Sequence, residues 1–299
     1  MSLLVVGALA YDTIETPSGR VEEVLGGAAA YFAVGASYFG PVRLVGVVGE
    51  DFKQEHRTLL LERGVNLDGL EVKPGKTFRW AGRYSGDMNV AQTTATHLNV
   101  LDGYMPKIPK AFRDSTFVFL SNGPPASQAS VLDQVPKAFS VLDTMNYWIQ
   151  ETWEDLLRVL KRVDMLVCND QEARAIAEDH SLIRAGKKLL DMGPKAVVVK
   201  KGEHGAFLWT KHGFHAIPAY PLDHVVDPTG AGDSFAGGLL GSLAASGSTD
   251  DRALRRAMIH GAIVASFTVE DFSLRRLRAI TRKEIDARYD EFLSFTAHP

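Results

Sequence analysis

The 299-residue sequence has little that would suggest a secreted or membrane-spanning protein. Its one cysteine, Cys168, lies in an apolar run and has no second cysteine in the chain to pair with, which is typical of a reducing compartment. No run approaches the roughly 18 apolar residues of a membrane span, and no basic segment with a cleavage site precedes the first strand pattern. These absences predict a cytoplasmic protein with no membrane partner.

A strong charge of one sign is also missing. The formal net charge is -3 at pH 7, and the arginines that gather after residue 250 are typical of solvated helix faces. We therefore expect a small-molecule partner and no nucleic acid. The sequence has no G-x-x-x-x-G-K-[ST], G-x-G-x-x-G, H-E-x-x-H or G-x-S-x-G segment. Their absence disfavours P-loop enzymes, dinucleotide-fold enzymes, zinc hydrolases and serine hydrolases.

The sequence does contain short apolar runs that alternate with helical periods. Fully apolar runs are typical of strands buried on both faces, and alternation with helices predicts parallel strands joined by right-handed crossovers. We expect a single α/β domain over residues 1–299, a three-layer α/β/α sandwich with a mostly parallel central sheet. Ligands of such sheets bind at the carboxyl ends of the strands. The runs are 3–6, 44–48, 117–120, 139–142, 165–168 and 196–199.

Two segments break this alternation. Residues 13–24 and 77–100 each read as two extended arms around a turn, the pattern of a β-hairpin. We expect the hairpins, over about 12–24 and 76–100, to form a small β-sheet lid at the carboxyl edge of the main sheet. Exposed hairpin edges favour pairing with a second copy, so the sequence also predicts a homodimer through the lid.

The most informative segment is Asp227–Phe235, where an apolar strand pattern gives way to a helical one. Gly230, Ala231 and Gly232 are small enough for their backbone N–H groups to face one cavity, and the helix adds its positive dipole end. A phosphate is the expected guest. Asp233 would then meet an incoming hydroxyl as a proton acceptor, although a glycine-rich turn with an N-cap would look similar.

The helix that follows contains three glycines, each of which costs about 1 kcal/mol relative to alanine. We therefore expect something to approach this backbone closely. The three are Gly237, Gly238 and Gly241.

Small residues also open an earlier helix. Gly26 and Gly27 precede three alanines, so a ligand could rest against the first turn. Asp12 follows the first strand, at the edge where ligands of parallel sheets bind, and could accept hydrogen bonds from ligand hydroxyls. A role as a turn or cap residue is the alternative for Asp12.

Two further patterns follow buried strands. Asn169 and Glu172 lie on one face at the start of a helix, an arrangement that a capping box would also produce. Lys201, Gly202 and Gly205 turn one strand into the next, and the glycines could admit a phosphate or ribose. Such a turn is common, so this pattern is weak evidence alone.

In order and spacing, these four motifs resemble the PfkB/ribokinase family of carbohydrate and nucleoside kinases across nearly the whole chain. The resemblance implies a ribokinase-like sandwich with a β-lid and an ATP-dependent transfer of phosphate to an alcohol. It implies that Asp233 is the catalytic base and that the backbone at Gly230, Ala231 and Gly232 forms the anion hole.

The resemblance also implies cofactor positions. Glu172 corresponds to a residue linked to Mg²⁺, through water because Mg²⁺ keeps much of its hydration shell. Some family members hold a monovalent cation such as K⁺, and the corresponding positions here are Asp227, Thr229 and Ser266. The nucleotide-side positions are Asn169, Lys201, Gly202, Gly205, Thr229 and His260, the last of them near the adenine.

On the acceptor side, the resemblance assigns Asp12, Gly26 and Gly27 to the hydroxyls of a small sugar or sugar derivative. The chain departs from the family where Tyr31 replaces the asparagine that usually follows Gly-Gly, which puts a ribokinase-like substrate in doubt. Phe272 replaces a small residue near the cation loop, and Gly49-Glu50-Asp51 lacks the glycine that often follows Gly-x-Asp. Both departures put cation activation in doubt.

Three alternatives remain open from the sequence. Tyr31, Phe78 and Trp80 could form an aromatic slot for the base of a nucleoside, although lid aromatics also pack against the sandwich. Arg79 and Arg83 could instead bind a phosphate already on a sugar. A noncatalytic metabolite sensor on the same fold is the third alternative, because a fold does not guarantee chemistry.

Overall fold

A mostly parallel central sheet forms the middle of the protein. The computed structural model describes residues 1–86 and 88–297, and within them nine strands pair in the order β13-β12-β11-β10-β9-β8-β1-β4-β5. The strands are β1 (Leu3–Val6), β4 (Val42–Gly49), β5 (Val65–Lys73), β8 (Phe117–Leu120), β9 (Phe139–Leu142), β10 (Met165–Asn169), β11 (Ala196–Lys200), β12 (Ala206–Thr210) and β13 (Gly213–Ile217).

The six predicted apolar runs all form strands of this sheet, and β5, β12 and β13 lie outside those runs. β1 pairs in parallel with β4 and β8, so that Val5 lies opposite Leu44 and Phe119. Near one edge, β12 runs antiparallel to both of its neighbours, β11 and β13, and is the one reversed strand among the nine of the described sheet. β5 was not among the predicted strands because its sequence is half polar, which suits an edge strand with one wet face.

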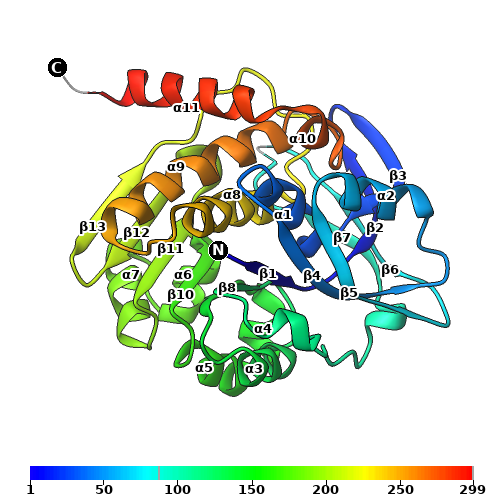
Figure 1. Ribbon diagram of the computed structural model, residues 1–299. Helices are drawn as coiled ribbons and strands as arrows, with labels where there is room; N and C mark the ends of the chain where they lie inside the picture. Colours follow the sequence, from blue (N-terminus) through cyan, green and yellow to red (C-terminus); the bar gives the residue numbers. More distant parts are fainter. Residues whose placement is uncertain (87, 298–299) are drawn as a thin grey trace.

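Helices cover both faces of the sheet and confirm the three-layer prediction (Figure 1). Two separate apolar cores result, one on each face. In the first, the rings of Phe32 and Phe119 stack with centroids 4.4 Å apart. On one face lie α1 (Ala28–Ser37), α2 (Gln54–Glu62), α8 (Ala231–Ser246), α9 (Asp251–Thr268), α10 (Arg275–Ala279) and α11 (Arg282–Thr296). On the other lie α3 (Pro125–Gln134), α4 (Asn146–Glu151), α5 (Trp153–Leu160), α6 (Asp170–Ala177) and α7 (Leu182–Asp191).

A second, small sheet contains the two predicted hairpins, in the strand order β3-β2-β6-β7. A short link joins β1 to this sheet, which therefore lies beyond the carboxyl end of β1, on the right of Figure 1. Its outer strands β3 and β7 are largely exposed. The homodimer stays a prediction, and sedimentation of the protein as a monomer would contradict it. The strands are β2 (Ala10–Thr16), β3 (Gly19–Gly26), β6 (Phe78–Arg83) and β7 (Gln92–His97).

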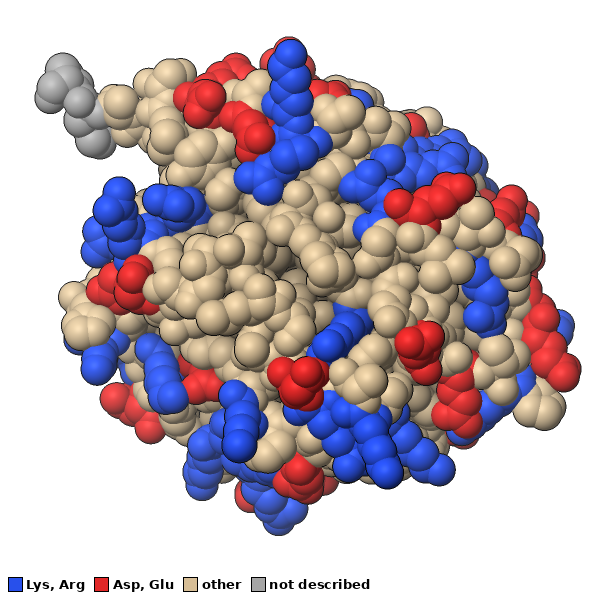
Figure 2. All heavy atoms as spheres, in the orientation of Figure 1, with Lys and Arg blue, Asp and Glu red and all other residues tan. Residues whose placement is uncertain are grey.

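The outer surface mixes both signs of charge. On the face shown in Figure 2, acidic side chains are interspersed among basic ones. Over residues 1–86 and 88–297, no helix combines the length and the apolar character needed to cross a bilayer.

Helix α8 is packed unusually closely by its two neighbours. A Cβ at Gly237 would lie 2.5 Å from the carbonyl oxygen of Phe32 in α1. A Cβ at Gly238 would lie 2.6 Å from the carbonyl oxygen of His260 in α9. The close approach that the glycines predicted is thus made by helix backbones, and it fixes the position of the start of α8.

We expect Gly237→Ala to destabilise the protein although alanine favours a helix by about 1 kcal/mol. The added methyl overlaps the Phe32 carbonyl, and such overpacking costs about 1–3 kcal/mol. Urea unfolding measures the difference. Gly40→Ala is the control, because its Cβ would meet nothing within 4 Å. Equal midpoints for the two variants would contradict the packing argument.

Candidate active site

The loop before α8 lies at the carboxyl edge of the main sheet and is shaped by Asp227. This side chain is fully buried, and its carboxylate accepts hydrogen bonds from the N–H groups of Thr229 (2.9 Å) and Ser273 (3.0 Å). Gly230 then takes a left-handed conformation with φ 74°, which glycine adopts without steric cost. The ring of Tyr31 lies directly beneath it, because a Cβ at Gly230 would be 2.3 Å from Cγ of Tyr31.

The backbone amides of this loop differ in their partners. The N–H of Ala231 donates to the carbonyl of Pro228 at 3.2 Å, so this amide is already engaged. Among the described residues, no group accepts from the N–H of Gly230 or of Gly232. Of the three amides that the sequence assigned to an anion hole, these two remain available for a ligand at the positive end of α8.

A lysine that the sequence analysis did not assign completes this site. Lys200 ends β11, and a Cβ at Gly232 would lie 2.8 Å from its Nζ, so residue 232 must be small for the ammonium group to reach the start of α8. The Nζ lies 3.8 Å from a carboxylate oxygen of Asp143, which directly follows β9. Lys200 therefore places a positive charge beside Gly232, one of the two residues whose amides are available.

Asp233 is in the first turn of α8, next to this charge. Burial is the main cause that raises the pKa of Asp233 to about 7; Asp143 raises it further and Lys200 lowers it. Burial alone would lower the pKa of Lys200, but the charges of Asp143, Glu172 and Asp233 raise it above its ordinary value. The lysine is therefore charged while Asp233 exchanges a proton near neutral pH.

Asp12 lies on the acceptor side of the same site. It belongs to β2 of the small sheet and is 3% exposed. A Cβ at Gly26 would lie 1.8 Å from its carboxylate, and the N–H of Gly27 donates to it. Burial raises the pKa of Asp12 to about 8, and the charges of Asp227 and Asp233 contribute. The structure thus brings the predicted acceptor residues Asp12, Gly26 and Gly27 together near Asp233.

Tyr31 is enclosed beneath the loop rather than exposed in a slot. It is 1% exposed, and its hydroxyl has no hydrogen-bond partner among the described residues. Burial raises the pKa of Tyr31, as does the charge of Asp12. Trp80 packs over Gly82, and its Nε1 donates to Thr93 Oγ1 at 3.2 Å. In this structure the Tyr31 ring is therefore not available to stack on a base, whereas Trp80 stays partly exposed.

Arg79 is engaged within the small sheet. Its guanidinium pairs with Glu23 at 2.8 Å and with Asp51 at 2.9 Å, and it donates to the carbonyl of Thr77 at 3.1 Å. Asp51 also accepts from the N–H and the hydroxyl of Thr77, both at 2.7 Å. These contacts anchor the small sheet to the loop after β4. A phosphate on the acceptor would have to displace two carboxylates to reach Arg79.

A cavity of about 550 Å³ extends from the loop along α8 and α9. Gly202 and Gly205 line one side, and both have positive φ. Lys200 and Gly232 lie on its wall, so the cavity includes the available amide of Gly232. The lining residues are Met88, Asn89, Lys200, Gly202, Glu203, His204, Gly205, Pro218, Ala219, Tyr220, Pro221, Leu222, Val225, Pro228, Ala231, Gly232, Phe235, Ala262, Ala265, Ser266 and Val269.

Three residues that were predicted to bind the nucleotide or a cation have other partners in the structure. They are Lys201, His260 and Ser266. The Nζ of Lys201 contacts the carbonyl of His204 at 3.3 Å and lies 3.8 Å above the Phe207 ring, outside the cavity. His260 is buried between helices, where Nδ1 bonds the Ser242 hydroxyl at 2.8 Å. Ser266 does line the cavity, but its hydroxyl accepts a hydrogen bond from Arg288. That bond is 2.8 Å long.

Asn169 and Glu172 form the capping box that the sequence left open. The Glu172 N–H donates to Asn169 Oδ1, and the Asn169 N–H donates to Glu172 Oε2, both at 2.8 Å. Glu172 is 6% exposed, and burial raises its pKa to about 7. One of its oxygens remains for a water or a cation. Over the described chain, no three His, Cys, Asp or Glu side chains gather as a metal site.

The small sheet also contributes a residue that sequence reasoning missed. Tyr84 follows β6, and its phenol accepts a hydrogen bond of 3.3 Å from the hydroxyl of Thr229 in the loop before α8. Burial raises the pKa of Tyr84 to about 12, with contributions from Asp227 and Asp12. The small sheet therefore contacts the loop directly, so a movement of one would be transmitted to the other.

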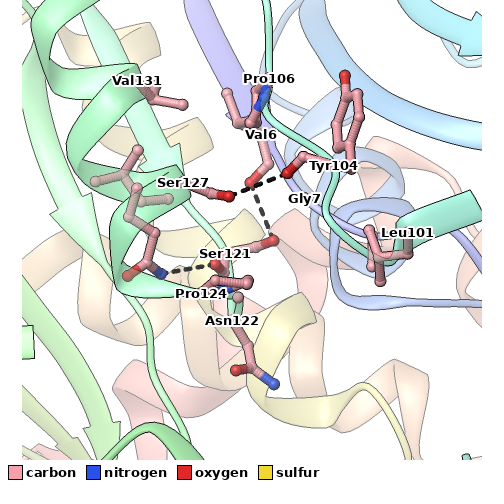
Figure 3. A pocket seen from close by; sticks show the side chains of 14 residues that line it. Val6, Gly7, Leu101, Tyr104, Pro106, Ser121, Asn122, Pro124, Ser127 and Val131 are labelled. Carbon is pink, nitrogen blue, oxygen red and sulfur yellow. Dashed lines mark hydrogen bonds between the residues drawn. The ribbon is translucent and has the colours of Figure 1, made fainter. Parts of the chain in front are cut away.

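A second cavity, of about 60 Å³, lies at the carboxyl ends of β1 and β8 (Figure 3). Its hydroxyl groups are already bonded: Ser121 donates to the carbonyl of Val6 at 3.0 Å, and Ser127 donates to that of Tyr104 at 3.1 Å. Its walls are otherwise largely apolar. This cavity therefore offers little recognition of a polar ligand compared with the larger one.

Comparison with known proteins agrees with this geometry. The profile described as "pfkB family carbohydrate kinase" matches residues 2–275. The chain belongs to the pfkB family. Its sequence is 33% identical over 247 residues to a cytidine kinase of Thermococcus kodakarensis, a match that covers 80% of this chain and 87% of that protein. The protein is therefore a phosphotransferase of the sugar and nucleoside kinase type.

Solved structures of a nucleoside kinase and a ribokinase share the fold. The nucleoside kinase of Burkholderia thailandensis, in complex with ADP-inosine, superposes with a TM-score of 0.80 at 22% identity, over 98% of this chain and 96% of that one. The ribokinase of Arabidopsis thaliana, with ribose and ATP, superposes with a TM-score of 0.75 at 21% identity, over 96% and 98%. The ribokinase-like fold predicted from the sequence is confirmed.

Proposed function

We propose that this pfkB-family protein transfers the γ-phosphate of ATP to a hydroxyl of a nucleoside. The observation that carries the proposal is the position of Asp233. It lies in the first turn of α8, next in the chain to Gly232, which lines the cavity of about 550 Å³, and near enough to the ammonium of Lys200 for that charge to lower its pKa.

The proposed step is an in-line displacement. The acceptor hydroxyl gives its proton to Asp233 as its oxygen bonds to the γ-phosphorus, and the bond from that phosphorus to the bridging oxygen breaks to release ADP. The amides of Gly230 and Gly232 and the ammonium of Lys200 stabilise the negative charge on the transferred group. Such donors act strongly because they are already oriented before the charge moves.

The small sheet acts as a lid in this proposal. Asp12 lies on it and holds the acceptor hydroxyls, while Tyr84 joins it to the loop before α8. Closure of the lid would exclude water, which would otherwise compete with the acceptor for the phosphate.

Mg²⁺ fits the charges of this site. When bound, it neutralises the phosphates of ATP and helps to orient them. Glu172, with one carboxylate oxygen not used in the capping box, would hold it through water. K⁺ beside Asp227 and Thr229 also stays a proposal, although Ser266 has a charged partner in Arg288.

The choice of a nucleoside rests on the relatives, and the pairing of Arg79 disfavours an acceptor that carries a phosphate. The cytidine kinase of T. kodakarensis is a relative over most of both chains. Arg79 is already paired with two carboxylates, and Arg83 pairs with Glu15, so neither is prepared for an acceptor that carries a phosphate. An unphosphorylated sugar, our first expectation from the sequence, is the second candidate.

A panel experiment tests the function. The protein is incubated with Mg·ATP and one acceptor at a time from a set of nucleosides, sugars, sugar phosphates and polyols, and ADP is measured. We expect ADP formation that depends on a nucleoside. Formation with sugars alone would reassign the acceptor, and ATP binding without turnover on any acceptor would support a noncatalytic sensor.

We expect kcat/KM to rise with pH through about pH 7 and to level off above it. Asp233 acts as a base only when deprotonated, and its pKa is raised to about 7, mainly by burial. Initial rates at subsaturating acceptor, measured between pH 5 and 9, give the profile. A profile that is flat from pH 5 to 7 would contradict the role of Asp233 as the base.

A further inference from the structure

The C-terminal helix α11 (Arg282–Thr296) lies beyond the residues that match the family profile, yet it contacts two walls of the large cavity. The first wall is the segment after β13, which contributes Tyr220, and the second is α9, which contributes Ser266. These walls lie far apart in the sequence. A helix that bonds to both can set the distance between them.

Arg288 of α11 makes the contacts to both walls. Its Nη1 donates to the hydroxyl of Ser266 at 2.8 Å, and its guanidinium lies 4.5 Å from the ring centroid of Tyr220. The Phe267 ring packs against the same guanidinium at 3.5 Å, and Glu270 accepts from it at 2.7 Å. The side chain is only 14% exposed, so these are contacts within the protein rather than surface ion pairs.

Two further residues of the helix, Glu291 and Phe295, also contact Tyr220. The Tyr220 hydroxyl donates to the carboxylate of Glu291 at 2.5 Å, and the Tyr220 ring contacts Phe295 with centroids 6.1 Å apart. Tyr220 is therefore held at its ring by Arg288 and Phe295 and at its hydroxyl by Glu291. Its orientation in the cavity wall depends on α11.

The proposed function puts the phosphates of ATP beside Lys200 and Gly232. Tyr220 lines the same cavity, together with Pro218, Pro221, Leu222 and Val225 of its own segment. An apolar wall with an aromatic ring suits a flat heterocycle rather than a triphosphate.

We infer that Arg288 is a positioning residue for the nucleotide base, which holds Tyr220 and Ser266 at the separation that a base requires. The inference rests on the proposed function in one respect, namely that the cavity binds ATP. It does not depend on the identity of the acceptor.

The test compares Arg288→Met with wild type and with Arg282→Met on the same helix. Arg282 pairs with Asp286 and contacts Phe39, away from the cavity, which makes it a matched control. We expect Arg288→Met to raise the Kd for ADP, measured by calorimetry, about tenfold, because two contacts to the walls are lost. The KM for ATP should rise similarly while kcat and the KM of the acceptor stay within about twofold.

Two further variants separate positioning from folding. Arg288→Lys keeps the charge without the planar fork and should give an intermediate Kd. Glu291→Gln, which leaves Arg288 in place, should raise the Kd about threefold. Any of four results would overturn the inference. They are an unchanged Kd for ADP in folded Arg288→Met, equal rises in the KM for ATP and for the acceptor, the same rise in Kd in Arg282→Met, and a wild type that binds no ADP. A wild type that binds ADP but phosphorylates no acceptor would overturn only the proposed function.

Discussion

We expect Asp233→Asn to lower kcat by about 1,000-fold, within the typical contribution of a positioned general base. The amide has nearly the shape of the carboxylate but cannot take the proton of the acceptor hydroxyl. The amides of Gly230 and Gly232 and the charge of Lys200 remain, so the Kd for ATP should change by no more than a few-fold. Steady-state kinetics with calorimetry measures both quantities.

Asp251→Asn is the control for this variant. Asp251 also lies in the first turn of a helix, α9, but its carboxylate accepts from the Thr210 hydroxyl and lies outside the cavity. It should keep kcat within about twofold, as surface changes generally do. If Asp233→Asn retained near-normal turnover, Asp233 would not be the base.

We expect Lys200→Met to lower kcat/KM for ATP by about 100-fold, because removal of one donor to the transferred group typically costs that much. Methionine keeps most of the length of the side chain and removes the ammonium group. The ammonium of Lys200 also lowers the pKa of Asp233, so its loss should move the rise of activity with pH to a higher pH. A pH series of kcat/KM with saturating acceptor measures both effects.

The adjacent Lys201→Met is the matched control. Lys201 is the residue that the glycine-turn motif predicted, but its side chain contacts His204 and Phe207 outside the cavity. Its kcat/KM for ATP should remain within a few-fold of the wild-type value. A larger loss in Lys201→Met than in Lys200→Met would contradict the placement of the phosphate beside Gly232.

Lys200 and Lys201 show how much of the fold and the site can be predicted from the sequence. The fold follows from short apolar runs alternating with helical periods, and the loop before α8 follows from the small residues ahead of Asp233. The order of the motifs along the chain correctly indicates the family. Motif spacing alone, however, cannot say which of two consecutive lysines faces the phosphate.

The alternation of side chains along β11 indicates which of the two lysines faces the phosphate. Ala196 and Val198 of β11 pack on the face of the sheet that α8 covers, whereas Val197 and Val199 pack on the opposite face. Side chains alternate along a strand, so Lys200 continues the row that faces α8. The signal was therefore present in the sequence, but it required knowing which face α8 covers.

Other residues could not have been found in this way. The burial of Tyr31 beneath Gly230 and the pairing of Arg79 with Glu23 and Asp51 depend on contacts between segments far apart in the chain. His260 is placed by the packing of α9 against α8 and α11, where its ring stacks on Tyr289 at 4.6 Å. No local pattern reports such contacts.

The central claim is that the γ-phosphate is transferred to an alcohol, with the loop before α8 stabilising the phosphate and Asp233 taking the proton of the alcohol. Phosphorus NMR of wild-type protein with Mg·ATP and a nucleoside follows both products directly. We predict one phosphomonoester of the nucleoside for each ADP formed. Inorganic phosphate in place of the phosphomonoester, or the same phosphomonoester at an equal rate with Asp233→Asn, would contradict the claim.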